Sequence, residues 1–146
     1  MSTVRVGSTF HVEGVTREQV WAYLEEIEHA ADWNTFVQSA SSDDPPGVGR
    51  EIDLCVGFLG LTFPAHAVAT ESDEPRRSVI EGRRPFPAEI GMELTETDSG
   101  VELEGWFEMR PGKFFPVPKF ALRKAVQKQY DRDTALLRSR LEALAD

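Results

Sequence analysis

Tyr130, Asp133 and Arg83 are the polar residues of this sequence best placed to act on a small molecule. Tyr130 and Asp133 lie on one face of a predicted C-terminal helix, where a hydroxyl could hydrogen-bond a carbonyl and a carboxylate could move a proton. A structural interpretation is simpler. Tyr130 would be a core tyrosine with its hydroxyl at the edge. Asp133 would form an ion pair with Arg140 on the same face, or with Arg83 or Arg84 across the predicted sheet.

The common catalytic and metal-binding motifs are missing from the sequence. It has no Gly-x-Ser-x-Gly elbow, no glycine-rich phosphate loop and no His-Glu-x-x-His pair. The three histidines, His11, His29 and His66, are widely spaced on different predicted elements, and alternation along its strand points His66 outwards. Cys55 is the single cysteine, so no disulfide can form within the chain. We therefore expect neither a metal site nor a cofactor.

The composition restricts the class of partner. The chain has 146 residues, and its 25 acidic residues outnumber 16 basic ones, for a net charge of −9. A negative domain repels phosphate backbones and anionic lipid surfaces, so nucleic acid is not expected as a partner. The length suits one domain over residues 1–146. No stretch resembles a signal peptide or membrane span, so we expect a cytoplasmic protein, monomeric or homodimeric, with no membrane span.

Apolar and polar residues alternate along much of the chain, which predicts strands. Residues 3–12 form the first strand, and residues 49–109 form an antiparallel meander with one apolar and one wet face. Residues 33–41 are predicted as a further short strand. Between the first strand and this short one, Thr16 begins a predicted helix over residues 17–31, with a break near residues 28–29.

The C-terminal part of the sequence, residues 118–144, has no Pro or Gly after its first residue and is rich in helix formers. Its apolar residues repeat at helical spacing, which predicts one amphipathic helix of roughly 40 Å. Such a helix is long enough to cross the whole sheet.

This order of elements resembles the START-like (Bet v 1-like) superfamily and, within it, the polyketide cyclase/dehydrase and lipid-transport family, also called SRPBCC. The matching pieces are residues 15–21, the Ala31-Asp32-Trp33 segment, Gly100 at the last hairpin and the amphipathic helix near residues 137–144. The resemblance implies an α+β helix-grip fold. In that fold a curved seven-stranded antiparallel sheet carries two short helices after the first strand, and one long C-terminal helix lies across it. A ligand cavity opens between sheet and helix, but the resemblance does not imply a single reaction.

Apolar residues that face the predicted helix are expected to line this cavity. On the sheet they are Phe58, Phe63, Ile90, Met92, Phe107 and Met109; near the opening they are Trp33, Phe36, Phe114 and Phe120; and on the helix they are Val126 and Tyr130. For any single residue, ordinary core packing is the alternative. The loop at residues 114–118 could likewise close the cavity mouth, or its phenylalanines could pack into the core.

Three functions fit these patterns. The first is binding or transport of a hydrophobic small molecule, such as a lipid, polyketide or isoprenoid, without catalysis. The second is a polyketide cyclase or dehydratase that uses Tyr130, Asp133 and Arg83, and two or more polar groups converging in the cavity would favour it. The third is a protein-interaction module that uses the long helix or the sheet face around Trp106, and a filled cavity would favour it.

Overall fold

Seven antiparallel strands form one curved sheet in the structure, a computed structural model that describes residues 3–145. The sheet order is β1-β7-β6-β5-β4-β3-β2, so the first strand pairs with the last one along the chain. The strands are β1 (Val4–Glu13), β2 (Val37–Ser41), β3 (Glu51–Phe58), β4 (Leu61–Asp73), β5 (Arg77–Arg84), β6 (Ala88–Glu96) and β7 (Gly100–Met109).

Three α-helices accompany the sheet within the described residues: α1 (Arg17–Glu25), α2 (Ala30–Trp33) and α3 (Lys119–Glu142). Short turns of 3-10 helix at Ile27–His29 and Ala143–Ala145 follow α1 and α3. The first of these turns is the predicted break between two helical pieces. Thr16 begins α1 with a capping box, because its hydroxyl accepts from the Gln19 N–H at 3.1 Å while its own N–H donates to the Gln19 side chain at 2.9 Å. The predicted helix-grip architecture is confirmed.

The strand expected at residues 33–41 begins later than predicted. Trp33 ends α2, and β2 starts only at Val37. The segment between them is a turn, because the Phe36 N–H donates to Asn34 Oδ1 at 3.0 Å and the Thr35 N–H donates to Asp133 Oδ2 at 3.1 Å. Side-chain acceptors therefore take the backbone donors that a strand would have used, and they attach this turn to α3.

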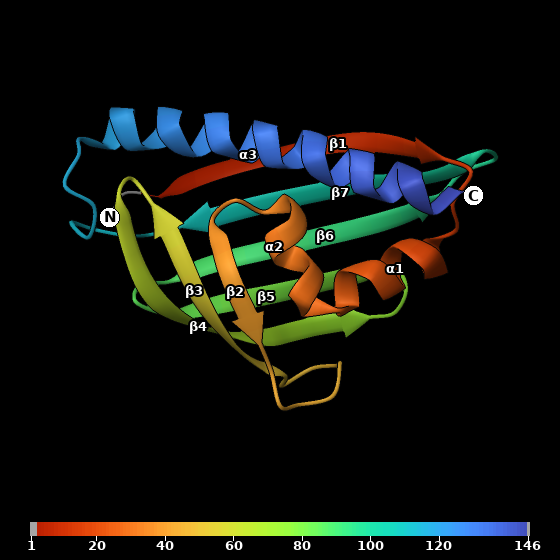
Figure 1. Cartoon of the computed structure of the whole chain (residues 1–146), viewed down its shortest axis with the longest axis horizontal. Helices are drawn as coiled ribbons and strands as arrows, with labels where there is room; N and C mark the ends of the chain where they lie inside the picture. The colour runs from red at the N-terminus through yellow and green to blue at the C-terminus, as the bar shows by residue number, and fades with distance from the viewer. Residues whose placement is uncertain (1–2, 146) are drawn as a thin grey trace.

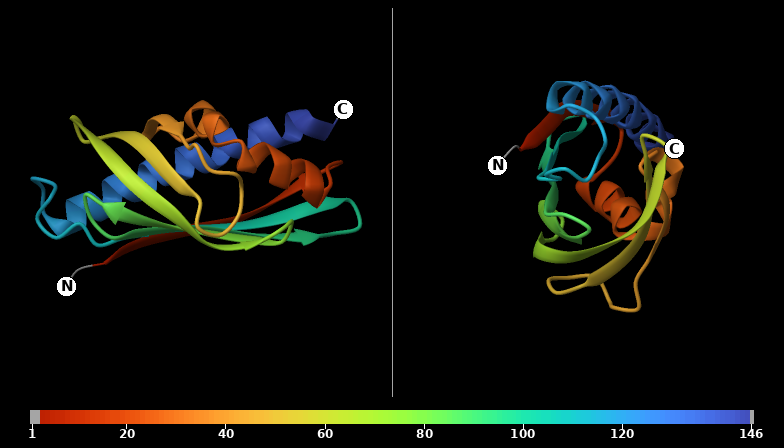
Figure 2. Two further views of the ribbon diagram at one scale, coloured as in Figure 1. Left: turned by 90° about the horizontal axis from the view of Figure 1, so that it is seen from below. Right: turned by 90° about the vertical axis from the view of Figure 1, so that its left-hand side faces the viewer.

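The long helix closes the open side of the sheet (Figure 1). α3 runs along β1 and also contacts α2. The end-on view in Figure 2 shows the sheet curving away from β1, passing beneath the short helices and rising again towards α3. None of the helices in residues 3–145 is long and apolar enough to cross a membrane.

The apolar core is divided into two clusters. One contains Phe10 and Val12 of β1 with residues of α1 and the C-terminal half of α3; the other contains Val4 and Val6 of β1 with residues of the first half of α3. Ser8 lies between the two on β1, and Gly105 faces it on β7. On α3, Tyr130 and Asp133 separate Val126 from Leu137. Small or polar residues on three elements therefore interrupt the core at the same level.

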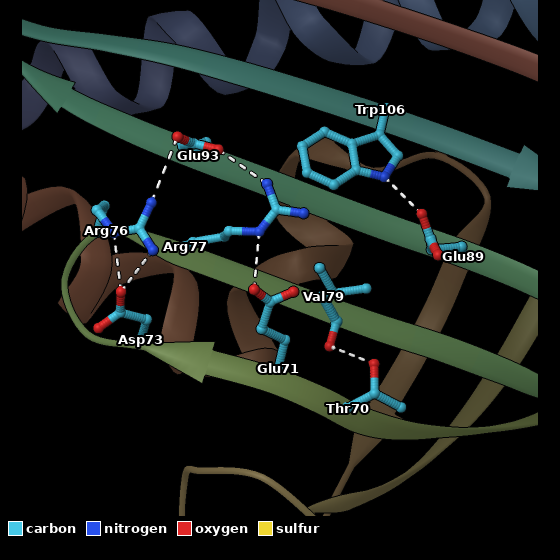
Figure 3. Close-up of polar contacts among 9 residues, drawn as sticks. All are labelled: Thr70, Glu71, Asp73, Arg76, Arg77, Val79, Glu89, Glu93 and Trp106. Atoms are coloured by element: carbon cyan, nitrogen blue, oxygen red, sulfur yellow. Dashed lines mark hydrogen bonds and ion pairs between the residues drawn. The ribbon is translucent and has the colours of Figure 1, made fainter.

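The other face of the sheet is polar and points away from the helices (Figure 3). Trp106 lies flat on this convex face, and its indole N–H donates to Glu89 at 2.8 Å. Arg77 lies 5.1 Å from the centre of the Trp106 ring and hydrogen-bonds both Glu71 and Glu93. The sheet face around Trp106 is thus a network of ion pairs, in which an arginine stacks on the indole.

Candidate ligand-binding site

A cavity of about 310 Å³ occupies the space between the two core clusters. Its walls come from the concave face of the sheet, from α2 and from α3. Ile90 lies in the middle of β6 and faces this space, and 42% of its surface is exposed. An isoleucine at the centre of a seven-stranded sheet remains exposed only where no side chain covers it, so the middle of the molecule is hollow.

Nine of the residues predicted to line a cavity do so. They are Trp33, Phe36, Phe58, Phe63, Ile90, Met92, Phe107, Met109 and Tyr130. Alternation selects the six that lie on strands, because they share the concave face with the buried residues of those strands, and helical spacing selects Tyr130. Asp133, one of the candidate polar residues, also lines the cavity.

Four predicted site residues lie elsewhere. Phe120 is in the first turn of α3, where it faces away from the sheet with 75% of its surface exposed. Val126 is fully buried between α3 and the sheet and belongs to a core cluster. Phe114 packs against Phe63, which lines the cavity, but Phe114 itself does not line it. Arg83 has its side chain on the convex face, 3.6 Å from Glu81, which shares that face of β5.

Phe115, Phe86 and Arg84 line the cavity although sequence patterns did not select them. Phe115 is buried, and its ring lies 5.3 Å from Phe58 and 5.6 Å from Phe86. Phe114 is 37% exposed, so of the two adjacent phenylalanines one packs inwards and the other remains partly outside. Loop residues have no periodicity that could have identified Phe86 or Phe115. The adjacent aromatic residues 114 and 115 were the only signal for Phe115.

Three hydroxyl groups converge at the level where the core is interrupted. Ser8 of β1 and Thr134 of α3 lie 3.4 Å apart at their hydroxyl oxygens, and both interact with the hydroxyl of Tyr130. Burial raises the pKa of Tyr130 above its ordinary value, and the hydrogen bonds from Ser8 and Thr134 oppose this rise. Gly105 makes room for the phenol, since a Cβ there would lie 3.2 Å from its oxygen. These neutral groups can donate to or accept from a ligand carbonyl or hydroxyl.

Asp133 is paired with a threonine and not with an arginine. The residue is 4% exposed, and its carboxylate accepts from the Thr35 N–H at 3.1 Å and the Thr35 hydroxyl at 2.8 Å. Gln129 in turn donates to the Thr35 hydroxyl at 2.8 Å. The predicted ion pair with Arg140, Arg83 or Arg84 is therefore wrong, because the turn after α2 supplies the donors. Burial raises the pKa of Asp133, and the Thr35 hydrogen bonds partly offset this effect.

A second polar group lies where α1 meets the cavity. Arg50 donates to the backbone carbonyl of Glu25 at 2.9 Å, and its guanidinium lies 3.8 Å from the Glu25 carboxylate. Burial raises the pKa of Glu25, while the charge of Arg50 lowers it. Both residues line the cavity, whose wall is otherwise mainly apolar.

One histidine lies between two carboxylates on the neighbouring strand. The ring of His66 hydrogen-bonds Asp53 and Glu51 of β3, each at 3.0 Å, and the bond to Asp53 raises its pKa. Within residues 3–145, no group of three or more His, Cys, Asp or Glu side chains is arranged to hold a metal ion.

Comparison with known proteins identifies the family. The family described as polyketide cyclase / dehydrase and lipid transport matches the chain over residues 3–142. The chain belongs to this family. No curated protein matches it by sequence.

Several solved structures are similar in fold to this chain. A START superfamily protein from Mycobacterium smegmatis has a TM-score of 0.78 at 16% identity, with 97% of this chain and 99% of that chain covered. The Zhui aromatase/cyclase from Streptomyces sp. R1128 has a TM-score of 0.78 at 14% identity, with 99% and 97% covered. The di-domain ARO/CYC StfQ of the steffimycin pathway has a TM-score of 0.74 at 13% identity, but only 50% of its chain is covered. At these identities, the likeness establishes the fold alone.

Proposed function

We propose that this protein binds and carries a hydrophobic small molecule of the lipid, polyketide or isoprenoid type. The observation that supports this proposal is the cavity of about 310 Å³ with Ile90 exposed at its centre. Cavities of this size, lined mainly by apolar side chains with a few polar groups, are typical of small-molecule sites.

Affinity in such a site would come mainly from the apolar surface of the ligand. Each square ångström removed from water contributes about 25 cal/mol, before the cost of immobilising the ligand. The hydroxyl groups of Ser8, Tyr130 and Thr134 would then determine which end of the ligand faces α3. A ligand with one carbonyl or hydroxyl group on an apolar body fits this distribution best.

The proposal can be tested by titrating delipidated protein with a fluorescent hydrophobic probe. We expect saturable binding at one site, and displacement of the probe by apolar ligands that carry a single oxygen function. Native mass spectrometry of gently purified protein should also detect a co-purifying hydrophobic mass. Binding no tighter than to an unrelated globular domain of the same size would refute the proposal.

Polyketide cyclisation or dehydration is the second candidate, because polar groups do converge in the cavity. Three hydroxyls and the buried Asp133 carboxylate line it together, and a shaped pocket with a proton donor or acceptor is the main requirement of such a reaction. The carboxylate is already engaged by Thr35, which favours a structural role and keeps binding as the first candidate.

The two candidates differ in what Tyr130→Phe and Asp133→Asn should do. A cyclase would change its product distribution from a poly-β-ketone substrate in at least one of these variants. Arg83→Gln is the matched control, since Arg83 lies on the convex face. Unchanged products in both cavity variants would remove these residues from any mechanism. The third candidate, an interaction module with a filled core, loses its main support because the core is hollow.

A further inference from the structure

Positive charge is concentrated at one end of this acidic protein. The end consists of residues 57–64, 83–88 and 110–124, which we call the basic tip. These segments contain seven of the 16 basic residues and none of the 25 acidic ones. Their basic residues are Arg83, Arg84, Arg110, Lys113, Lys119, Arg123 and Lys124.

The three segments of the basic tip are far apart in the sequence but adjacent in space. The turn between β3 and β4, the loop between β5 and β6, and the loop that leads into α3 lie at the same end of the sheet in Figure 1 and in the left view of Figure 2. Of the seven basic side chains, only Arg83 forms an ion pair within the described residues, with Glu81 at 3.6 Å. The fold therefore gathers cations that mostly lack an ion pair at one end of the molecule, while the rest of the chain is strongly negative.

Exposed apolar side chains lie among these cations. Leu59 is 40% exposed, Phe114 is 37% exposed and Phe120 is 75% exposed, one in the β3–β4 turn and two around the start of α3. Leu59 adopts a positive φ of 52°, which is uncommon for a side chain of this kind. Large apolar residues between lysines and arginines are typical of surfaces that enter the boundary region of a lipid bilayer.

The basic tip is also next to the cavity. The ring of Phe114 lies 4.9 Å from Phe63 and 5.1 Å from Phe115, and both of these line the cavity. One layer of aromatic side chains therefore separates the exposed tip from the interior. A hydrophobic ligand in a membrane would meet this end of the protein first.

We propose that the basic tip docks on an anionic lipid surface, with Leu59, Phe114 and Phe120 directed towards the acyl chains. This proposal rests on the proposed function, because docking would deliver a hydrophobic ligand to the cavity or receive one from it. A lipid surface fits better than an acidic protein, since the exposed apolar residues come from separate segments that lie among cations, as in surfaces that enter the boundary region of a bilayer. The negative remainder of the molecule would be repelled by the same surface and so fix the orientation.

The test is binding of the full-length protein to vesicles of phosphatidylcholine, with and without about 30% phosphatidylglycerol as the anionic lipid. We expect binding to the anionic vesicles only, and a marked loss in about 0.5 M salt. The combined variant Lys119→Gln/Arg123→Gln/Lys124→Gln should bind roughly 100-fold more weakly, because each basic residue near such a surface contributes about a factor of five. Phe120→Ser should weaken binding as well.

Matched control variants are available on the same helix. Arg132→Gln/Arg138→Gln/Arg140→Gln removes the same charge from exposed positions in the second half of α3, and Leu136→Ser removes an exposed apolar residue there. Both should bind vesicles nearly as well as the natural sequence. Equal losses in the tip and control variants would overturn the proposal. The proposal would also be overturned if the natural protein bound anionic and neutral vesicles equally well or bound neither. An acidic protein would then be the partner to test.

A probe titration without vesicles separates this proposal from the proposed function. The tip variants should bind the fluorescent hydrophobic probe as tightly as the natural protein, because none of the changed residues lines the cavity. Probe binding without vesicle binding would refute the docking proposal and leave the proposed ligand-binding function intact. Vesicle binding without any probe binding would refute the proposed ligand-binding function.

Discussion

Ile90 is the residue that most directly reports the hollow interior. It lies opposite Ile80 on β5 and Phe107 on β7, at the centre of the concave face, and yet it is exposed. A larger side chain at this position would extend into free space and would not collide with packed neighbours. Ile90 thus offers a way to fill the cavity without disturbing the core.

We expect Ile90→Trp to lower the affinity for a hydrophobic probe at least about 10-fold while changing the free energy of unfolding by no more than about 1 kcal/mol. Fluorescence titration and urea denaturation measure the two quantities. Leu136→Trp is the control, because Leu136 is exposed on the outer side of α3 and should leave probe binding unchanged. A large loss of stability in Ile90→Trp would mean that the space is already filled in solution.

Asp133 should make stability depend on pH in a defined direction. Burial raises its pKa above the ordinary 3.8, so the folded state holds this proton more tightly than the unfolded state does. The stabilising contribution of the protonated form is complete below about pH 4 and is lost as the pH rises through the raised pKa. Asp133→Asn removes this titration but keeps one oxygen for Thr35.

The free energy of unfolding of Asp133→Asn should therefore increase relative to that of the natural protein between about pH 4 and pH 7, because only the natural protein loses this stabilising contribution as the pH rises. Urea denaturation at several pH values measures this difference. The same carboxylate-to-amide change at exposed Asp131, on the same helix, is the control. A difference that is constant with pH, or that moves in the opposite direction, would contradict this account of Asp133.

The position of Asp133 could be predicted from the sequence, but its partner could not. Helical spacing places Asp133 on the buried stripe of α3, which is correct. Thr35 lies in a turn with no periodic pattern, nearly a hundred residues earlier in the chain. Such a contact depends on how the turn after α2 meets α3, and an arginine was the more obvious partner for a carboxylate.

At the level of elements, the strands and the long helix were the most predictable parts. Alternation repeats over eight or more residues in most of the strands, and the apolar stripe of α3 extends over the whole helix. The exceptions are short segments. Residues 34–36 form a turn in place of a strand, and the loop before α3 contributes Phe115 to the cavity wall but leaves Phe114 at the surface.

The packing of β6 against β7 on the convex face depends on one glycine. The indole of Trp106 lies directly over Gly91, so that a Cβ at Gly91 would be 2.0 Å from the ring. The ring also stacks against Arg77 and bonds Glu89. Any side chain at position 91 would have to push the indole off the sheet.

Gly91→Ala should therefore lower the free energy of unfolding by about 1–3 kcal/mol. Urea denaturation measures the effect, and Gly57→Ala in β3 is the control, because only the flexible Gln38 side chain lies close to that position. In a Trp106→Ala background the cost of Gly91→Ala should largely disappear. A cost that persists without the indole would assign the effect to the backbone of β6.

At the scale of the whole molecule, the sheet links the ends of the chain. β1 pairs with β7, and α3 then packs over β1, so no part of the sheet is separated from the rest by a linker. One domain over residues 1–146 stays a prediction, which unfolding can test. The helix-grip architecture could be predicted from the order of elements in the sequence. The concentration of cations at one end could not, because it depends on three distant segments meeting in space.

We expect one cooperative unfolding transition. Tryptophan fluorescence, which reports on Trp21, Trp33 and Trp106 in different elements, should change at the same urea concentration as far-ultraviolet circular dichroism. Cavity variants such as Ile90→Trp should shift both signals together. Two separate transitions would show that the helices and the sheet unfold as independent units.

The pairing of β1 with β7 also determines when this protein can fold during its synthesis. Val4 pairs with Met109, so the first strand has no partner until roughly a hundred further residues have been made, which takes on the order of ten seconds. During that time its apolar face, which is buried in the finished protein, remains open to water and to other chains. Folding of this protein should consequently be slow to start, and nascent chains should be captured by chaperones that recognise exposed apolar strands.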